Sequence, residues 1–95
     1  MATHVIRATV RVEQNVSDRD SWAVDLVEHS ELSDPLKEGW FWATWPDRVE
    51  FTFTFQGERS SIAQYTREIE QFLLGAPHVM GKPQLTVEER GGNEA

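Results

Sequence analysis

The chain has 95 residues, no cysteine and a net charge of −7, and 39% of its residues are hydrophobic. These values predict one globular domain, residues 1–90, with a flexible tail at 91–95, and they exclude disulfides and cysteine-ligated metals. The chain has no signal-peptide pattern and no apolar run of bilayer length, so we expect a soluble cytoplasmic protein without membrane contact. The acidic charge also disfavours nucleic-acid binding, because phosphates attract cationic surfaces.

The first predicted element is a strand over residues 4–13, because its side chains alternate between apolar and polar. The apolar set is Ile6, Ala8, Val10 and Val12, and the polar set is Arg7, Thr9, Arg11 and Glu13. Such a strand has one dry face and one polar face.

Residues 18–32 fit a helix that ends before Pro35, and residues 17–21 supply an N-cap candidate followed by acidic residues that suit a helix N-terminus. Apolar side chains recur there at helical spacing. Residues 21–29 also alternate as a strand would, so a longer sheet covered by one helix remains the rival architecture.

A β-hairpin is predicted around the turn at residues 45–48, where Pro46 and Asp47 occupy the two central positions. Residues 40–45 and 49–55 form its arms. A two-residue loop places Trp45 opposite Arg48 and Trp42 opposite Phe51, which directs Trp40 and Trp42 into the core and Phe41 and Trp45 to the other face.

After Gly57 the apolar period changes to that of a helix. Ser61 and Gln64 fit a capping box, an apolar stripe runs over residues 62–73, and Gly75 fits a C-terminal cap. Residues 84–89 alternate and predict a last strand. The whole order predicts an α+β fold, the ferredoxin-like βαββαβ two-layer sandwich, with a four-stranded antiparallel sheet and two helices on one face.

No catalytic or metal-binding constellation is visible in the sequence. His4, His29 and His78 are scattered, Ser60 and Ser61 lie at a predicted helix start, and the glycines are too dispersed to cradle a phosphate. We therefore expect no metal and no cofactor, and a non-enzymatic role is favoured over an enzymatic one.

The favoured function is a small acidic protein-interaction module, a regulatory, adaptor or inhibitor subunit that binds a protein partner or itself as a homodimer. Its predicted contact residues are Arg7, Arg11, Phe41 and Trp45, which share the outer sheet face or its edge strand. Aromatic and arginine side chains are enriched at protein interfaces, and an uncovered apolar edge strand favours partner contact.

Two alternatives remain open at this stage. One is a dimeric α/β-barrel-type small-molecule binder or cofactor-independent enzyme with an aromatic pocket. The residues proposed to line that pocket are Trp22, Trp40, Trp42, Tyr65 and His78. The other is mimicry of nucleic acid by the acidic side chains of residues 18–34.

Overall fold

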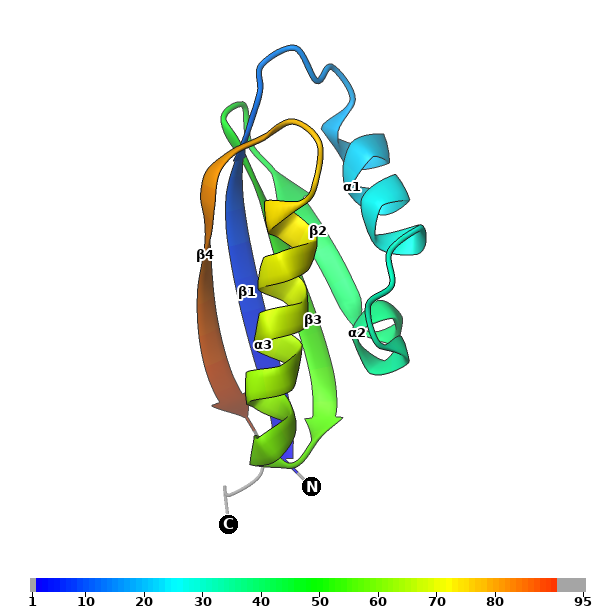
Figure 1. Cartoon of the computed structure of the whole chain (residues 1–95), viewed down its shortest axis with the longest axis vertical. Coiled ribbons are helices and arrows are strands. Elements are labelled where there is room, and N and C mark those ends of the chain that lie inside the picture. The colour runs from blue at the N-terminus through cyan, green and yellow to red at the C-terminus, as the bar shows by residue number, and fades with distance from the viewer. Residues whose placement is uncertain (1, 91–95) are drawn as a thin grey trace.

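The computed structural model describes residues 2–90, so the predicted tail at 91–95 lies outside the described residues. The domain contains four strands and three helices (Figure 1). In chain order these are β1 (Ala2–Val12), α1 (Arg19–Glu28), α2 (Asp34–Glu38), β2 (Trp40–Thr44), β3 (Arg48–Gly57), α3 (Arg59–Leu74) and β4 (Val79–Arg90).

The strands form one antiparallel sheet in the order β2-β3-β1-β4, which places β1 and β3 in the centre and β2 and β4 at the edges. The predicted hairpin and its register are confirmed, because Trp40 pairs with Phe53 and Trp42 pairs with Phe51. The turn is closed by mutual backbone hydrogen bonds between Trp45 and Arg48. The register follows from the short loop, since a slip by one residue would expose every apolar side chain of β3.

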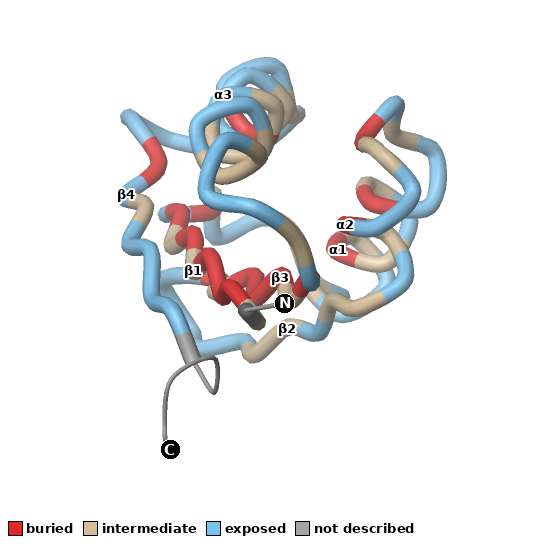
Figure 2. Tube along the Cα trace, turned by 90° about the horizontal axis from the view of Figure 1, so that it is seen from below, coloured by how far each residue is buried: buried red, intermediate tan, exposed pale blue. Residues whose placement is uncertain are grey.

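All three helices lie on the same side of the sheet (Figure 2). The core between the two layers is built on Phe51 and Phe53 of β3, Ile69 and Leu73 of α3, and Leu36 of α2, all completely buried. Each such side chain contributes about 1.5–3 kcal/mol through removal of apolar surface from water. The predicted meeting of the aromatic hairpin with the apolar stripe of α3 is therefore confirmed.

The segment between β1 and β2 is helical, as predicted, and the rival strand at residues 21–29 is wrong. However, α1 is shorter than the predicted helix over 18–32, because it ends at Glu28 with His29 as C-cap. Residues 34–38 form an additional helix, α2, that the sequence pattern does not predict. Pro35 lies in the first turn of α2, where a proline is well tolerated because the first amides of a helix have no partner within it. The expectation of two helices is corrected to three.

Two element starts also differ from expectation. Helix α3 begins at Arg59 with Glu58 as N-cap, so the Ser61–Gln64 capping box is wrong, although Gly75 is the C-cap as predicted. Strand β4 begins at Val79 rather than at residue 84 and contains Pro83. A proline is compatible with β4 because this strand lies at the edge of the sheet and its pairing with β1 shifts register near Arg11.

Candidate functional site

One face of the sheet carries no helix, and we call it the open face (Figure 2). Side chains alternate across the sheet, so the residues between the core positions of each strand point to this side. On β1 they include Arg7 and Arg11, whereas the neighbouring Ile6 and Val10 belong to the core cluster. The open face is the only large surface of the sheet that the described residues leave uncovered.

Three large apolar side chains on the open face contact solvent. Phe41 is 57% exposed, Trp45 38% and Met80 45%. Trp45, Arg48, Arg11 and Met80 follow one another in a row across the sheet, because Trp45 pairs with Arg48, Arg48 with Arg11 and Arg11 with Met80. This row therefore combines exposed apolar surface with two arginines.

The charges of the open face have both signs. Arg7 forms an ion pair of 3.2 Å with Glu88, and the guanidinium of Arg48 lies 4.5 Å from the ring centre of Trp45, a cation–π contact. Glu50 occupies the same face beside Thr9. Within residues 2–90, Arg11 forms no ion pair, although it lies directly opposite Arg48. An arginine in that position is available to a carboxylate from outside the chain.

The structure thus places all four predicted contact residues on one surface. Phe41 lies on the edge strand β2, Trp45 directly follows it, and Arg7 and Arg11 lie on the central strand β1. The small side chains of Val5 and Thr52 lie between these residues on the same face. Their neighbours cover them almost completely, because Val5 is 2% exposed and Thr52 3%. Whether these residues bind a partner stays a prediction.

The five aromatic residues proposed for a pocket have separate surroundings. The rings of Trp40 and Trp42 lie 5.2 Å apart against the core at a tilt of 31°, and Tyr65 meets Phe55 edge-on at 4.7 Å. His78 lies in the connection before β4, 3.4 Å from Glu13. Of the five, Trp22 lines a hollow between helices.

That hollow belongs to a groove between α1 and α3, which we call the α1–α3 groove. Two adjoining cavities of about 480 and 380 Å³ share Ser30 and Phe72 and have mainly apolar walls. Trp22, Leu26 and Leu32 contribute further apolar side chains to the lining, together with Ala76 and Pro77. The sequence contained the apolar residues but no signal for the separation of the two helices, which depends on long-range packing.

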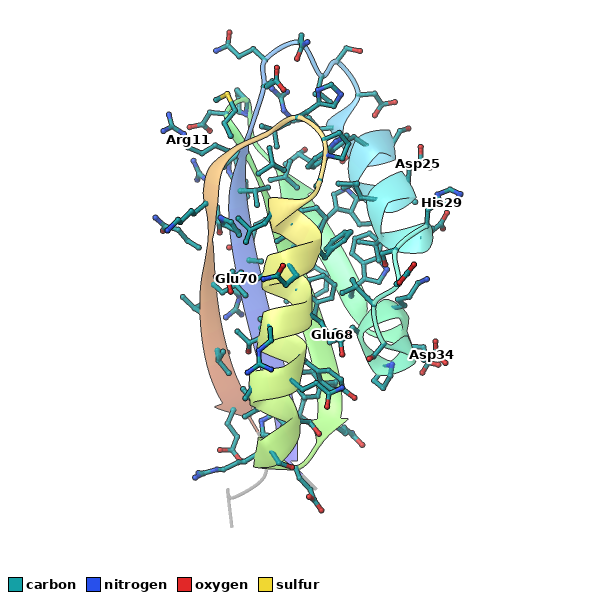
Figure 3. All side chains as sticks on the ribbon, viewed as in Figure 1. Arg11, Asp25, His29, Asp34, Glu68 and Glu70 are labelled. Carbon is teal, nitrogen blue, oxygen red and sulfur yellow. The ribbon has the colours of Figure 1, made fainter. Side chains whose placement is uncertain are left out.

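Two hydrogen-bonded bridges span this groove. At one end the indole Nε1 of Trp22 donates to the carbonyl of Pro77 at 3.2 Å. At the other end the backbone amide of Ser33 donates to Oε1 of Glu68 at 3.0 Å, and the Ser33 hydroxyl donates to Oε2 at 2.9 Å. Figure 3 shows Glu68 extending from α3 toward α2. The first bridge ties α1 to the connection after α3, and the second ties the start of α2 to α3.

The acidic residues are concentrated in the helical layer, on the opposite side from the open face. In residues 18–38 the basic side chains are Arg19 and Lys37. The acidic side chains of that segment are Asp18, Asp20, Asp25, Glu28, Glu31, Asp34 and Glu38. The two layers therefore differ in charge, one strongly acidic and the other mixed.

Hydrogen bonding from the backbone amide of Ser21, and then from its hydroxyl, lowers the pKa of Asp18 below its ordinary value of 3.8. This carboxylate is the N-cap of α1, so its charge is also favoured by the positive end of the helix dipole. Its role in the structure is capping, because both of its oxygens accept hydrogen bonds from Ser21.

Among residues 2–90 no group of three or more histidine, aspartate or glutamate side chains is arranged to hold a metal ion. None of the helices in this part of the chain combines the length and the apolar character of a transmembrane helix. No protein-family model, curated protein sequence or solved structure matches the chain.

Proposed function

We propose that this protein is a small, acidic, non-enzymatic interaction module that self-associates through the open face and acts as a regulatory, adaptor or inhibitor subunit. The observation that carries the proposal is the gathering of Phe41, Trp45 and Met80 with arginines on the one sheet face that no helix covers. Exposed apolar and arginine side chains with a polar surround are typical of interfaces.

Charge favours a second copy of the chain as the occupant. The helical layers of two copies repel each other, because both are acidic. Among residues 2–90 Arg11 of the open face has no ion pair, and the same face carries Glu50, so two such faces related by a two-fold axis offer each other opposite charges. Contact between open faces also covers Phe41.

The non-enzymatic part of the proposal is supported by the structural roles of polar groups that catalysis would otherwise employ. The Ser33 hydroxyl is held by Glu68, and the Ser21 hydroxyl is held by Asp18. A nucleophilic serine needs a base that a third group orients, whereas these two carboxylates also accept the backbone amides of the same serines at the starts of α2 and α1. Cytoplasmic location stays a prediction from the absence of cysteine.

We further propose that the fold is a ferredoxin-like βαββαβ sandwich, with α2 as an addition between α1 and β2. The central position of β1 and β3 and the placement of the helices on one face support this assignment. Fold alone carries no function, so the interaction role rests on the surface residues.

Sedimentation velocity over a wide concentration range tests self-association. We expect a species of about twice 10.9 kDa that dissociates on dilution. Phe41→Ser should weaken the dimer about tenfold, since interface aromatics carry much of the binding free energy. Leu74→Ser is the matched control, because Leu74 is 49% exposed but lies on α3.

Arg11→Glu should also weaken the dimer, whereas Arg67→Glu, an equal charge change on α3, should weaken it much less. A protein that stays monomeric at millimolar concentration would overturn the proposal. So would a dimer that responds equally to the open-face variants and to their controls.

The α1–α3 groove supports a second candidate function, the binding of a small apolar molecule. Its two adjoining cavities, of about 480 and 380 Å³, have the size of a small-molecule site, and Leu26 lines the smaller one. Binding of the fluorescent probe anilinonaphthalene sulfonate to the folded protein tests this function. Leu26→Glu should abolish the probe fluorescence and Phe41→Ser should leave it unchanged, and equal losses would contradict binding in the groove.

A further inference from the structure

Strand β2 is an edge of the sheet that lacks the usual protection. Natural edge strands avoid pairing with other chains through charges, prolines or bulges. Residues 40–45 contain no charged residue and no proline, and among residues 2–90 no strand pairs with the far side of β2. By contrast, the other edge, β4, carries Lys82, Pro83 and two glutamates.

The backbone groups that β2 presents to solvent can be assigned from its pairing. Trp45 exchanges hydrogen bonds with Arg48, and the Thr54 amide donates to the Gly39 carbonyl at 2.7 Å. Because hydrogen-bonded pairs alternate along an antiparallel ladder, the amides and carbonyls of Trp40, Trp42 and Thr44 point away from β3. These groups form an unused half-ladder.

Helix α1 lies above this edge. Figure 1 shows α1 on the side of β2 away from β3, whereas α2 contacts β3, and Figure 2 shows both helices raised above the sheet. The indole Nε1 of Trp42 donates to Oδ1 of Asp20 at 2.7 Å, which places the first turn of α1 over β2. A strand added beside β2 would therefore lie beneath α1.

The flank of α1 over that space is acidic. Asp20, Val24 and Glu28 follow at a spacing of four residues and share one flank of the helix, whereas Trp22 and Leu26 face the α1–α3 groove. Asp20 and Glu28 are both exposed. On the opposite face the added strand would lie beside Phe41, which is 57% exposed.

We propose that the free edge of β2 binds an extended, basic segment of a partner protein, which adds as a further strand beneath α1. Alternate side chains of that segment face the helical layer and are Lys or Arg, paired with Asp20 and Glu28. The side chains between them are apolar and pack beside Phe41. Main-chain hydrogen bonds to Trp40, Trp42 and Thr44 supply affinity, as in other cases of strand addition.

A second copy of this chain fits the edge poorly. Two β2 strands paired about Trp42 would bring the two α1 helices together, with Asp20 and Glu28 of each copy near those of the other. Like charges at that distance oppose association, whereas a basic segment is attracted. The edge site shares Phe41 with the open face, but the main-chain ladder of β2 and the acidic flank of α1 do not depend on self-association there.

Peptide binding tests the proposal directly. The probe is a fluorescein-labelled peptide of sequence Lys-Val-Lys-Val-Lys-Val-Lys, followed by fluorescence anisotropy, with Glu-Val-Glu-Val-Glu-Val-Glu as the charge control. We expect binding of the lysine peptide, weakened by added salt, and none of the glutamate peptide. Equal binding of the two peptides, or binding of neither, overturns the proposal.

N-methylation tests the hydrogen-bonded ladder. Only alternate amides of an added strand face β2, so methylating one alternate set of the lysine peptide should weaken binding at least about tenfold. Methylating the other set should leave affinity within about twofold. Equal tolerance of both methylated peptides overturns strand addition.

Protein variants locate the site. Thr44→Pro removes an amide that points outward and should weaken the lysine peptide about tenfold, while Thr44→Val keeps the amide and should bind normally. Glu28→Lys should weaken binding about fivefold relative to Glu70→Lys, an equal charge change at an exposed site on α3 (Figure 3). If Glu70→Lys has as large an effect as Glu28→Lys, the edge site is excluded even where Thr44→Pro fails to fold.

Discussion

The indole of Trp42 on the edge strand donates a 2.7 Å hydrogen bond to the carboxylate of Asp20 in the first turn of α1. This bond and the burial of Ala23 and Val27 join α1 to the sheet. Because α1 carries both the acidic flank over β2 and one wall of the α1–α3 groove, its position determines both surfaces.

Removal of this bond should loosen α1. Asp20→Ala is expected to lower the free energy of unfolding by about 1 kcal/mol, the usual net value of one hydrogen bond. Asp20→Asn keeps an acceptor oxygen and should lose less than half as much. Urea unfolding followed by far-ultraviolet circular dichroism measures both values, and equal losses for the two variants would contradict a role for the acceptor.

The bridge between Glu68 and Ser33 gives a second prediction. Glu68 accepts from both the amide and the hydroxyl of Ser33, and Gln64 donates to it at 3.1 Å. Glu68→Ala should destabilise the fold by about 1–2 kcal/mol, since it leaves half-buried donors without a partner. Hydrogen exchange should show faster exchange of the α2 amides.

Glu70 supplies the control for that experiment, because it is exposed on the same helix. Glu70→Ala should change stability by no more than about 0.5 kcal/mol. The effects of Glu68→Ala and Ser33→Ala on stability should be clearly non-additive, because the two substitutions remove the same contact between these side chains. Additive losses would mean that the two side chains act separately.

The hairpin and the core were predictable because local signals agreed with one another. Pro46 and Asp47 specify a tight turn, the alternation of residues 49–55 specifies a half-buried strand, and together they set the register seen in the pairing of Trp42 with Phe51. The open-face positions of Phe41 and Trp45 follow from the same register.

The segment between β1 and β2 was harder to predict because a proline can either follow the end of a helix or lie in the first turn of the next one. The sequence predicts that a helix ends before Pro35, yet Pro35 lies in the first turn of α2. The proposed pocket depended on which aromatic residues meet in space. Periodicity assigns Tyr65 to the buried flank of α3 but does not reveal that it packs against Phe55.

The N-cap of α1 predicts a specific pH dependence. The pKa of Asp18 is lowered in the folded protein, chiefly by the amide of Ser21, so the ionised form stabilises the fold. This contribution is complete above the unfolded value of 3.8 and is lost as the pH falls through the lower folded pKa. Asp18→Ala should therefore be less stable than the native chain near neutral pH.

That difference should narrow as the pH falls below 3.8, because the carboxylate becomes protonated and loses its charge. Asp18→Asn caps the helix without a charge, so its stability relative to Asp18→Ala should not vary with pH. Parallel urea titrations of the three proteins measure these differences. A gap between the native chain and Asp18→Ala that does not narrow as the pH falls below 3.8 would contradict stabilisation by the ionised carboxylate.

Gly39 marks the point where the chain leaves α2 and enters the edge strand. Its carbonyl accepts the Thr54 amide, and a Cβ placed on it would collide with the carbonyl oxygen of Thr54. That oxygen belongs to the backbone of central strand β3 and cannot move without disturbing the sheet. Gly39→Ala should therefore destabilise the protein by about 1–3 kcal/mol, the usual cost of overpacking.

Gly57 offers the matched control at the end of β3. A Cβ there would meet the Ser61 hydroxyl oxygen at 3.8 Å, which is ordinary van der Waals contact. Gly57→Ala should change the free energy of unfolding by less than about 1 kcal/mol. Because Gly39 lies next to Trp40, the Gly39→Ala variant should also bind the lysine peptide more weakly when the β2 edge is displaced. If Gly39→Ala and Gly57→Ala have equal free energies of unfolding, α2 can shift to relieve the collision, and the predicted overpacking at Gly39 is wrong.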